Sequence, residues 1–195
     1  MNLYFIMNKL KNIRLLIAGG GNIGKRHANV IKNIDQLKLV GIADPNIEIK
    51  SLCQSLGVSY GSDLNLMMKD RNIDGVIVAS PTDQHYSNSK TALKMGAHVL
   101  IEKPITEKLD DAIALRELAY KKNRRILVGH HRRYNPELLK AKQLIENGYL
   151  GKVIGVNGQW TVRKHTEYYN PEWRRSEAHG PIMINLVHEI DSLRF

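Results

Sequence analysis

Cysteine is almost absent from this sequence, which has 195 residues and one cysteine, Cys53. A single thiol rules out a disulfide framework and any cysteine-rich metal site. No apolar run approaches the roughly 20 residues that a membrane-spanning helix needs. Because the first seven residues lack the basic start and cleavage site of a signal peptide, we expect a cytoplasmic protein with no membrane partner. The eight histidines show no HExxH or related ligand spacing, so we expect no metal.

Acidic residues are also scarce. There are 19 Asp and Glu against 29 Lys and Arg, which gives a formal net charge of +10. Most of the excess lies between residues 121 and 175, where 13 basic residues less 4 acidic ones leave +9. Three explanations fit this excess of positive charge: a solvated basic surface, attraction of an anionic small molecule, and nucleic-acid binding. Since no zinc finger, RNP pattern or lysine-rich arm accompanies the charge, we expect no nucleic-acid partner.

Short apolar runs alternate with segments of helical spacing over the first two thirds of the chain. The strand-like runs are apolar throughout, which is typical of strands that are covered on both faces. This alternation predicts an α/β fold with a doubly wound parallel sheet of the Rossmann type. Six strands are expected, at residues 13–18, 37–43, 58–60, 75–79, 98–102 and 126–129.

The pattern changes after the sixth of these runs. Asn135 followed by Pro136 is typical of a helix start. Residues 153–164 have the pattern of a long strand and residues 182–195 that of a helix, but an isolated strand cannot complete a second core. We therefore expect the second domain to continue outside this chain. The expected parts are an N-terminal extension at 1–12, a Rossmann domain at 13–130, and the beginning of a truncated substrate domain at 131–195.

A glycine-rich segment follows the first expected strand. Its GxGxxG pattern has its glycines at Gly19, Gly21 and Gly24. Gly19 permits a tight turn, Gly21 lets the backbone approach a pyrophosphate, and Gly24 lets the next helix pack against the strand. The backbone N–H groups at the helix start, including those of Asn22 and Ile23, would face the phosphates. The segment therefore predicts a dinucleotide site.

An aspartate closes the second expected strand, about 20 residues after the glycines. A carboxylate at Asp44 can accept both ribose hydroxyls of an adenosine and would repel a 2′-phosphate, which favours NAD over NADP as the cofactor. Lys25 and Arg26 keep NADP open, because they can tolerate an additional phosphate. Asp44 also fits the role of a turn former before Pro45.

Ser80, Pro81 and Thr82 follow the fourth expected strand at its carboxyl end, where ligands bind in doubly wound sheets. We expect this loop to touch the nicotinamide half of the cofactor, and a capped turn is the alternative. His85 starts the next helix and is a candidate for a cofactor contact or a cap.

The Glu-Lys-Pro sequence at 102–104 completes a set of segments that resembles the Gfo/Idh/MocA family of oxidoreductases, named for glucose-fructose oxidoreductase and inositol dehydrogenase. The resemblance implies a Rossmann domain followed by an α/β domain with a large open sheet. In full-length relatives that sheet holds substrate and usually forms the interface of a homo-oligomer. The similar segments are GGGNIGKRHA at 19–28, SPTDQH at 80–85, GAHVLIEKPI at 96–105, VGHHRRYNP at 128–136, EWRR at 172–175 and GPIMINLVHEID at 180–191.

The resemblance also implies reversible hydride transfer between a nicotinamide and the hydroxyl-bearing carbon of a sugar, cyclitol or related small molecule. Lys103 would be the catalytic lysine, donating to the substrate oxygen and stabilising developing alkoxide charge. Glu102 would lie beside the cofactor. His188 would be the general base that removes the hydroxyl proton.

The sequence departs from the family pattern on the helix that carries His188. The family has an aspartate four residues before the histidine, and here that residue is Ile184. Asn185 carries no charge but is a candidate to contact substrate or to orient the imidazole, and Arg174 is a candidate substrate or cofactor contact. Asp191 is another possible partner of the histidine, although the resemblance implies a structural role for it. The departure keeps an alternative open, in which the chain is an NAD(H)-binding fragment or sensor module without turnover.

Replacing Asp44 with alanine should weaken NADH binding far more than NADPH binding, because only the ribose of NADH offers both hydroxyls to the carboxylate. Fluorescence titration of both cofactors checks this. Equal losses for the two cofactors would contradict the ribose contact.

Overall fold

The computed structural model describes residues 12–69, 72–159, 161, 163–170 and 185–195. The chain divides into two compact units, Met1–Gly129 and His130–Phe195. Residues 1–11 of the expected N-terminal extension at 1–12 lie outside the described residues, as do Arg174 and Ile184. Among the described helices, none has the length and apolar character that a membrane crossing requires.

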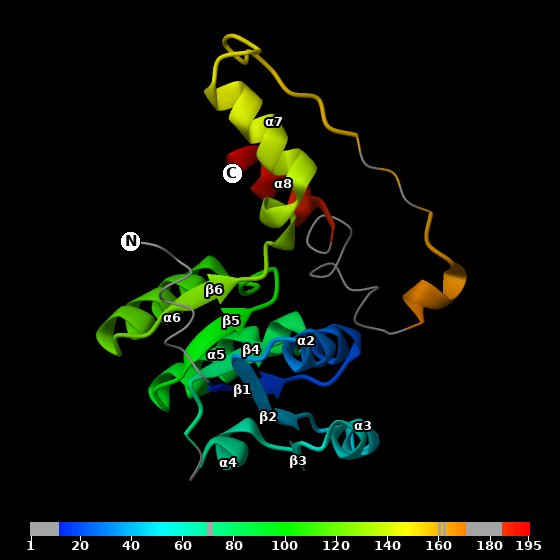
Figure 1. The fold of residues 1–195 in the computed structure, drawn as a ribbon, viewed down its shortest axis with the longest axis vertical. Helices are drawn as coiled ribbons and strands as arrows, with labels where there is room; N and C mark the ends of the chain where they lie inside the picture. The colour runs from blue at the N-terminus through cyan, green and yellow to red at the C-terminus, as the bar shows by residue number, and fades with distance from the viewer. Residues whose placement is uncertain (1–11, 70–71, 160, 162, 171–184) are drawn as a thin grey trace. The chain divides into compact units, whose positions relative to one another are not determined.

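The first unit is built on a parallel sheet in which the strands lie in the order β3-β2-β1-β4-β5-β6 (Figure 1). The chain starts in the middle of the sheet, moves outward to β3, then returns and moves outward to β6. This arrangement confirms the predicted Rossmann fold, including all six strands. The strands are β1 (Ile13–Ala18), β2 (Leu37–Ala43), β3 (Ser59–Gly61), β4 (Gly75–Val78), β5 (His98–Ile101) and β6 (Ile126–Val128).

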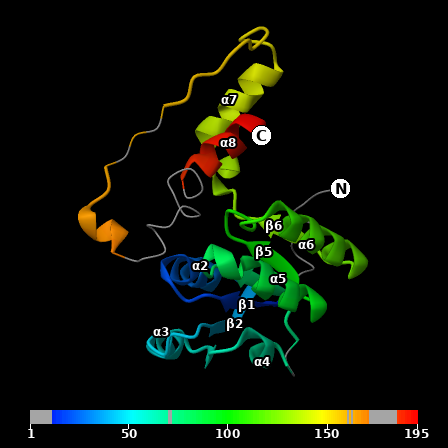
Figure 2. The same ribbon diagram turned by 180° about the vertical axis from the view of Figure 1, so that it is seen from behind.

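Helices cover both faces of this sheet (Figure 2). Neighbouring residues of a strand point to opposite faces of the sheet. Leu16 and Ile17 are neighbours in β1 and both are fully buried, so both faces of the sheet are covered there. Ile17 packs in the cluster that contains α2 and α3 residues, whereas Leu16 packs in the cluster that contains residues of α4, α5 and α6. The buried parts of these strands are therefore apolar on both faces. The helices are α2 (Asn22–Lys32), α3 (Ile49–Leu56), α4 (Leu64–Met68), α5 (His85–Lys94) and α6 (Leu109–Lys121).

The second unit contains η2 (His131–Tyr134), α7 (Pro136–Glu146), η3 (Thr166–Tyr169) and α8 (Val187–Arg194). The predicted start of α7 is confirmed, since the Asn135 side chain accepts hydrogen bonds from the backbone N–H groups of Glu137 and Leu138. α7 ends at Glu146, and Gly148 follows it in a left-handed conformation, φ 76°.

The strand expected at 153–164 is wrong for the residues of that range that the structure describes. They form no strand, and residues 153–159 are exposed. A strand needs a neighbour for its backbone N–H and C=O groups, and no other segment of this unit's described residues offers one. The sequence pattern indicated a segment suited to a sheet but not the partner that a sheet requires.

The turn from β1 into α2 depends on glycines for two different reasons. A Cβ atom added at Gly24 would lie 1.9 Å from the carbonyl oxygen of Gly19. Gly19 itself has a φ of +100°, and a Cβ there would lie 2.5 Å from the backbone nitrogen of Ser80. A Cβ at Gly21 would meet nothing within 4 Å. Two of the glycines are therefore required by the fold, and the third leaves an open space.

We expect Gly24→Ala to lower the free energy of unfolding by about 1–3 kcal/mol, the usual cost of forcing atoms into a packed region. Gly21→Ala is the matched control and should change it by less than about 0.5 kcal/mol, as at an open surface position. Chemical denaturation measures both. Similar losses for the two variants would contradict the packing role of Gly24.

Candidate functional site

Four predicted elements of the site follow neighbouring strands of one sheet edge. The glycine loop follows β1, Asp44 follows β2, the Ser80 loop follows β4, and Glu102 with Lys103 follows β5. These strands are adjacent and parallel. Their carboxyl ends therefore lie along the same edge, where ligands of doubly wound sheets bind.

The glycine loop ends in an open helix N-terminus. Gly21 is the residue before α2, and no described side chain caps the helix there. Asn22 and Ile23, the first residues of α2, are exposed. The free N–H groups of a helix start, together with its positive dipole end, suit a phosphate. The space that a Cβ at Gly21 would occupy is also open, so these residues fit the pyrophosphate of a dinucleotide.

Asp44 holds the glycine loop in place. Its Oδ2 accepts a hydrogen bond of 2.6 Å from the backbone N–H of Gly20, and its Oδ1 accepts one of 2.8 Å from Asn46. The side chain is only partly buried, and each carboxylate oxygen has a second lone pair. The turn-forming role and a ribose contact are therefore compatible in one side chain.

The Ser80 loop is anchored by α5. The Asn88 amide donates to Ser80 Oγ at 3.0 Å. His85 is 2 % exposed, and its Nδ1 and Nε2 lie 2.8 and 2.9 Å from the carbonyl oxygens of Pro104 and Ser80. With both ring nitrogens engaged by backbone, this histidine connects two loops of the site. The cofactor contact that the sequence offered as one alternative for His85 stays a prediction.

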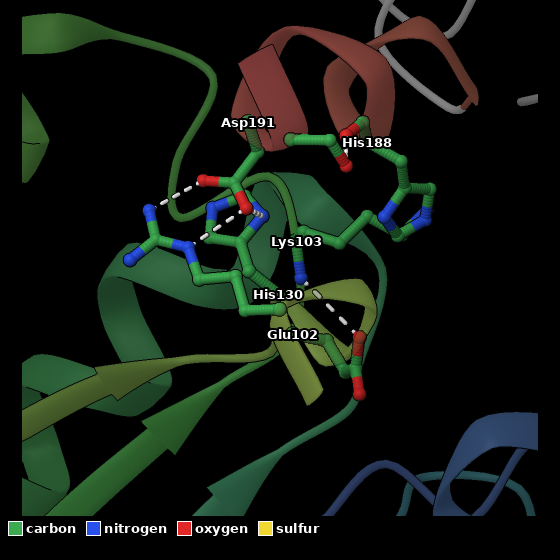
Figure 3. Close-up of polar contacts among 7 residues, drawn as sticks. Glu102, Lys103, His130, His188 and Asp191 are labelled. Carbon is green, nitrogen blue, oxygen red and sulfur yellow. Dashed lines mark hydrogen bonds and ion pairs between the residues drawn. The ribbon is translucent and has the colours of Figure 1, made fainter. Parts of the chain in front are cut away.

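Lys103 is the second residue after the end of β5 and is partly buried. The adjacent Glu102 carboxylate accepts a hydrogen bond of 3.3 Å from the Lys103 backbone N–H (Figure 3) and lies 2.8 Å from Nε2 of His27 on α2. Burial raises the pKa of Glu102, but the hydrogen bond and charge of His27, with the Lys103 backbone and charge, outweigh it and lower the pKa below its usual value. The carboxylate therefore favours its charged form.

Two contributors to the site were missed in the sequence, His27 and Asn88. Neither belongs to a periodic pattern or a recognisable pair. The one available signal for His27 was its place inside the segment GGGNIGKRHA at 19–28, which resembles the family.

In the second unit, His188 lies on α8 and is 8 % exposed. Its ring meets the edge of His131 at 4.9 Å between centroids. Asn185 lies in the two π-helical residues that lead directly into α8, and it is partly buried. Within the described residues, no group of three or more His, Cys, Asp or Glu side chains is arranged to hold a metal.

Asp191, one turn after His188, is a buried acid with several basic neighbours (Figure 3). Arg133 donates to it twice, at 2.9 Å from Nε and 2.6 Å from Nη2, and His130 Nδ1 lies 3.5 Å from its Oδ2. The Arg133 hydrogen bonds lower the pKa of Asp191, burial opposes them, and the charges of His130, Arg133 and His188 lower it further. A negative charge therefore lies within electrostatic reach of His188.

Comparison with known families matches both parts of the chain. Residues 13–130 match the GFO/IDH/MocA family described as "Oxidoreductase family, NAD-binding Rossmann fold". Residues 138–195 match the GFO/IDH/MocA C-terminal domain.

Curated relatives agree. The chain is 34% identical over 187 residues to the uncharacterized oxidoreductase YrbE of Bacillus subtilis, covering 95% of this chain and 54% of the relative. It is 32% identical over 188 residues to the myo-inositol 2-dehydrogenase of Thermotoga maritima, which covers 94% of this chain and 54% of that relative. The chain thus spans about half the length of these relatives.

Solved structures include the WlbA dehydrogenase from Bordetella pertussis in complex with NADH and UDP-GlcNAcA, with a TM-score of 0.85 and 28% identity over 94% of this chain and 54% of that one. The scyllo-inositol dehydrogenase from Lactobacillus casei with bound NAD(H) and scyllo-inositol has a TM-score of 0.81 and 25% identity over 94% and 56%. The matched domains and these relatives show that the chain belongs to the GFO/IDH/MocA family of oxidoreductases.

Proposed function

We propose that the intact protein is an NAD-dependent dehydrogenase that acts on the hydroxyl-bearing carbon of a sugar, cyclitol or related small molecule. The observation that carries this proposal is the placement of the glycine loop, Asp44 and Lys103 after neighbouring strands at one sheet edge. The family supplies the class of chemistry, and the inositol dehydrogenases among the relatives point to the class of substrate.

NAD is proposed over NADP because of the charge at Asp44. Its carboxylate is fixed by the backbone N–H groups of Gly20 and Asn46, so it cannot easily turn away from a ligand. A fixed negative charge repels a 2′-phosphate and accepts hydrogen bonds from ribose hydroxyls. Lys25 and Arg26, which are exposed on α2, are the residues that would oppose this preference.

The nicotinamide ring, when bound, supplies the hydride acceptor or donor. The free N–H groups at the start of α2 would hold the pyrophosphate, and Asp44 would hold the adenosine ribose. The Ser80 loop, fixed by His85 and Asn88, would shape the nicotinamide half of the site.

Lys103 is proposed to stabilise the substrate oxygen. During oxidation of an alcohol, negative charge develops on that oxygen as the proton leaves, and an ammonium group beside it lowers the energy of this state. In the reverse direction the same group polarises the carbonyl. Partial burial of the side chain strengthens the interaction by limiting competition from water.

His188 is proposed as the base that removes the hydroxyl proton, with the role reversed in reduction. Ile184 provides no negative charge four residues earlier. Asp191 supplies a negative charge instead. It lies one turn after His188 along α8, and the charges of the two groups interact. A nearby negative charge favours the imidazolium that forms when the histidine takes the proton.

The direct test is a dehydrogenase screen of the intact protein. Myo-inositol, scyllo-inositol, simple aldoses and nucleotide-linked sugars would be offered with NAD, and NADH formation followed by absorbance. Turnover of at least one of them supports the proposal. Saturable NADH binding with no turnover of any of these compounds would contradict it and favour an NAD(H)-binding protein without catalysis.

Lys103→Ala should abolish turnover of the substrate found in that screen while NADH still binds, because the glycine loop and Asp44 are unchanged. Lys94→Ala is the matched control, since Lys94 is exposed at the end of α5. Initial rates and fluorescence titration are the two measurements. Turnover by Lys103→Ala within a few fold of the parent protein would remove Lys103 from the mechanism.

A further inference from the structure

His27 joins two elements of the site that are far apart in the sequence. It lies on α2, the helix that follows the glycine loop, and its Nε2 is 2.8 Å from Oε1 of Glu102, 75 residues later. A carboxylate can only accept, so Nε2 must be the donor. The pair is shielded, with 24% and 18% of the two side chains exposed. Shielding makes such a hydrogen bond stronger than the same bond in water.

The Glu102 carboxylate is enclosed by more than His27. Its Oε2 accepts the backbone N–H of Lys103. On another side it lies against Gly129, after β6, where an added Cβ would be 3.0 Å from Oε2. Gly129 in turn donates its N–H to the carbonyl oxygen of Ile101 at 2.8 Å. The carboxylate therefore occupies a place that the backbone leaves open for it.

This arrangement links the charge of Glu102 to Lys103. The charge of Lys103 is among the causes that lower the pKa of Glu102, so the two groups interact. Without His27, the burial that raises the pKa of Glu102 would be less well compensated, and rotation of the carboxylate toward water would become favourable. Such a rotation would remove both the acceptor of the Lys103 N–H and the negative neighbour of its side chain.

We propose that His27 is a positioning residue, which holds the Glu102 carboxylate beside Lys103 and so fastens the lysine loop to the helix of the glycine loop. The inference rests on the proposed function of Lys103. Its consequence is that the helix start that would bind pyrophosphate and the loop that carries the lysine form one connected element. A displacement of about 1 Å at a reacting group can cost 10²-fold in rate, which gives such a connection its importance.

The first measurement does not require activity. NMR of the intact protein follows the Glu102 carboxyl carbon through an acid titration and the amide proton of Lys103 at neutral pH. In His27→Ala, the titration midpoint of Glu102 should move to higher pH, because the hydrogen bond and charge of His27 are the largest causes that lower it. The Lys103 amide proton should move upfield as its acceptor leaves. An unchanged midpoint and amide shift would overturn the proposal.

The second measurement is kinetic and uses the substrate found in the dehydrogenase screen described above. His27→Ala should lower kcat about 10- to 100-fold with little change in the dissociation constant of NADH. His27→Gln, which keeps a donor, should recover most of the rate. In a Glu102→Ala background, His27→Ala should have no further effect, because residues that act through one another are not additive.

His98→Ala is the matched control. His98 lies at the opposite end of β5, is exposed, and accepts a hydrogen bond from the Arg125 backbone at 3.0 Å. This variant should leave kcat unchanged. Additive losses in the His27 and Glu102 double variant, or an unchanged kcat in His27→Ala despite a shifted Glu102 midpoint, would overturn the positioning role. If the parent protein oxidises none of the compounds in the dehydrogenase screen, the proposed function fails. The NMR result alone then decides whether His27 holds Glu102 and the Lys103 loop.

Discussion

The turn from β1 into α2 is possible because two backbone segments pass each other there with no side chain between them. The carbonyl oxygen of Gly19 occupies the place where a Cβ of residue 24 would be. This close approach aims the start of α2 at the sheet edge and brings Gly19 against the backbone of Ser80. The loops after β1 and β4 are thereby set side by side before any polar side chain contributes.

Polar side chains then fix the remaining loops, each with a different geometry. Asp44 accepts from the backbone of Gly20, His85 lies between two carbonyl oxygens, and Glu102 lies between His27 and the Lys103 backbone. The Asp44–Gly20, His85–Pro104 and His27–Glu102 contacts join residues that are 24, 19 and 75 positions apart in the sequence. The edge of the sheet is therefore a network in which loops support one another, a common property of sites that must be rigid before a ligand arrives.

The sheet was predictable because strands buried on both faces leave an unbroken apolar signal, as in β4 and in the last four residues of β1. The glycines were predictable because their spacing reflects a local backbone requirement. The segment at 153–159 was not, because local composition carries no information about whether a partner strand is present. The pairing of His27 with Glu102 was also hidden, since residues 75 apart in sequence meet only after the sheet has formed.

The backbone contacts of Asp44, together with the ribose contact proposed for it, would restrict how this chain could exchange one cofactor for another. An aspartate that only contacted ribose could be replaced by a small or basic residue at no cost to the loop. Here the same carboxylate supports the N–H groups of Gly20 and Asn46. A change of cofactor preference would therefore need a second substitution to restore the turn, and evolution toward NADP would have to pass through a less stable intermediate or begin with the compensating change.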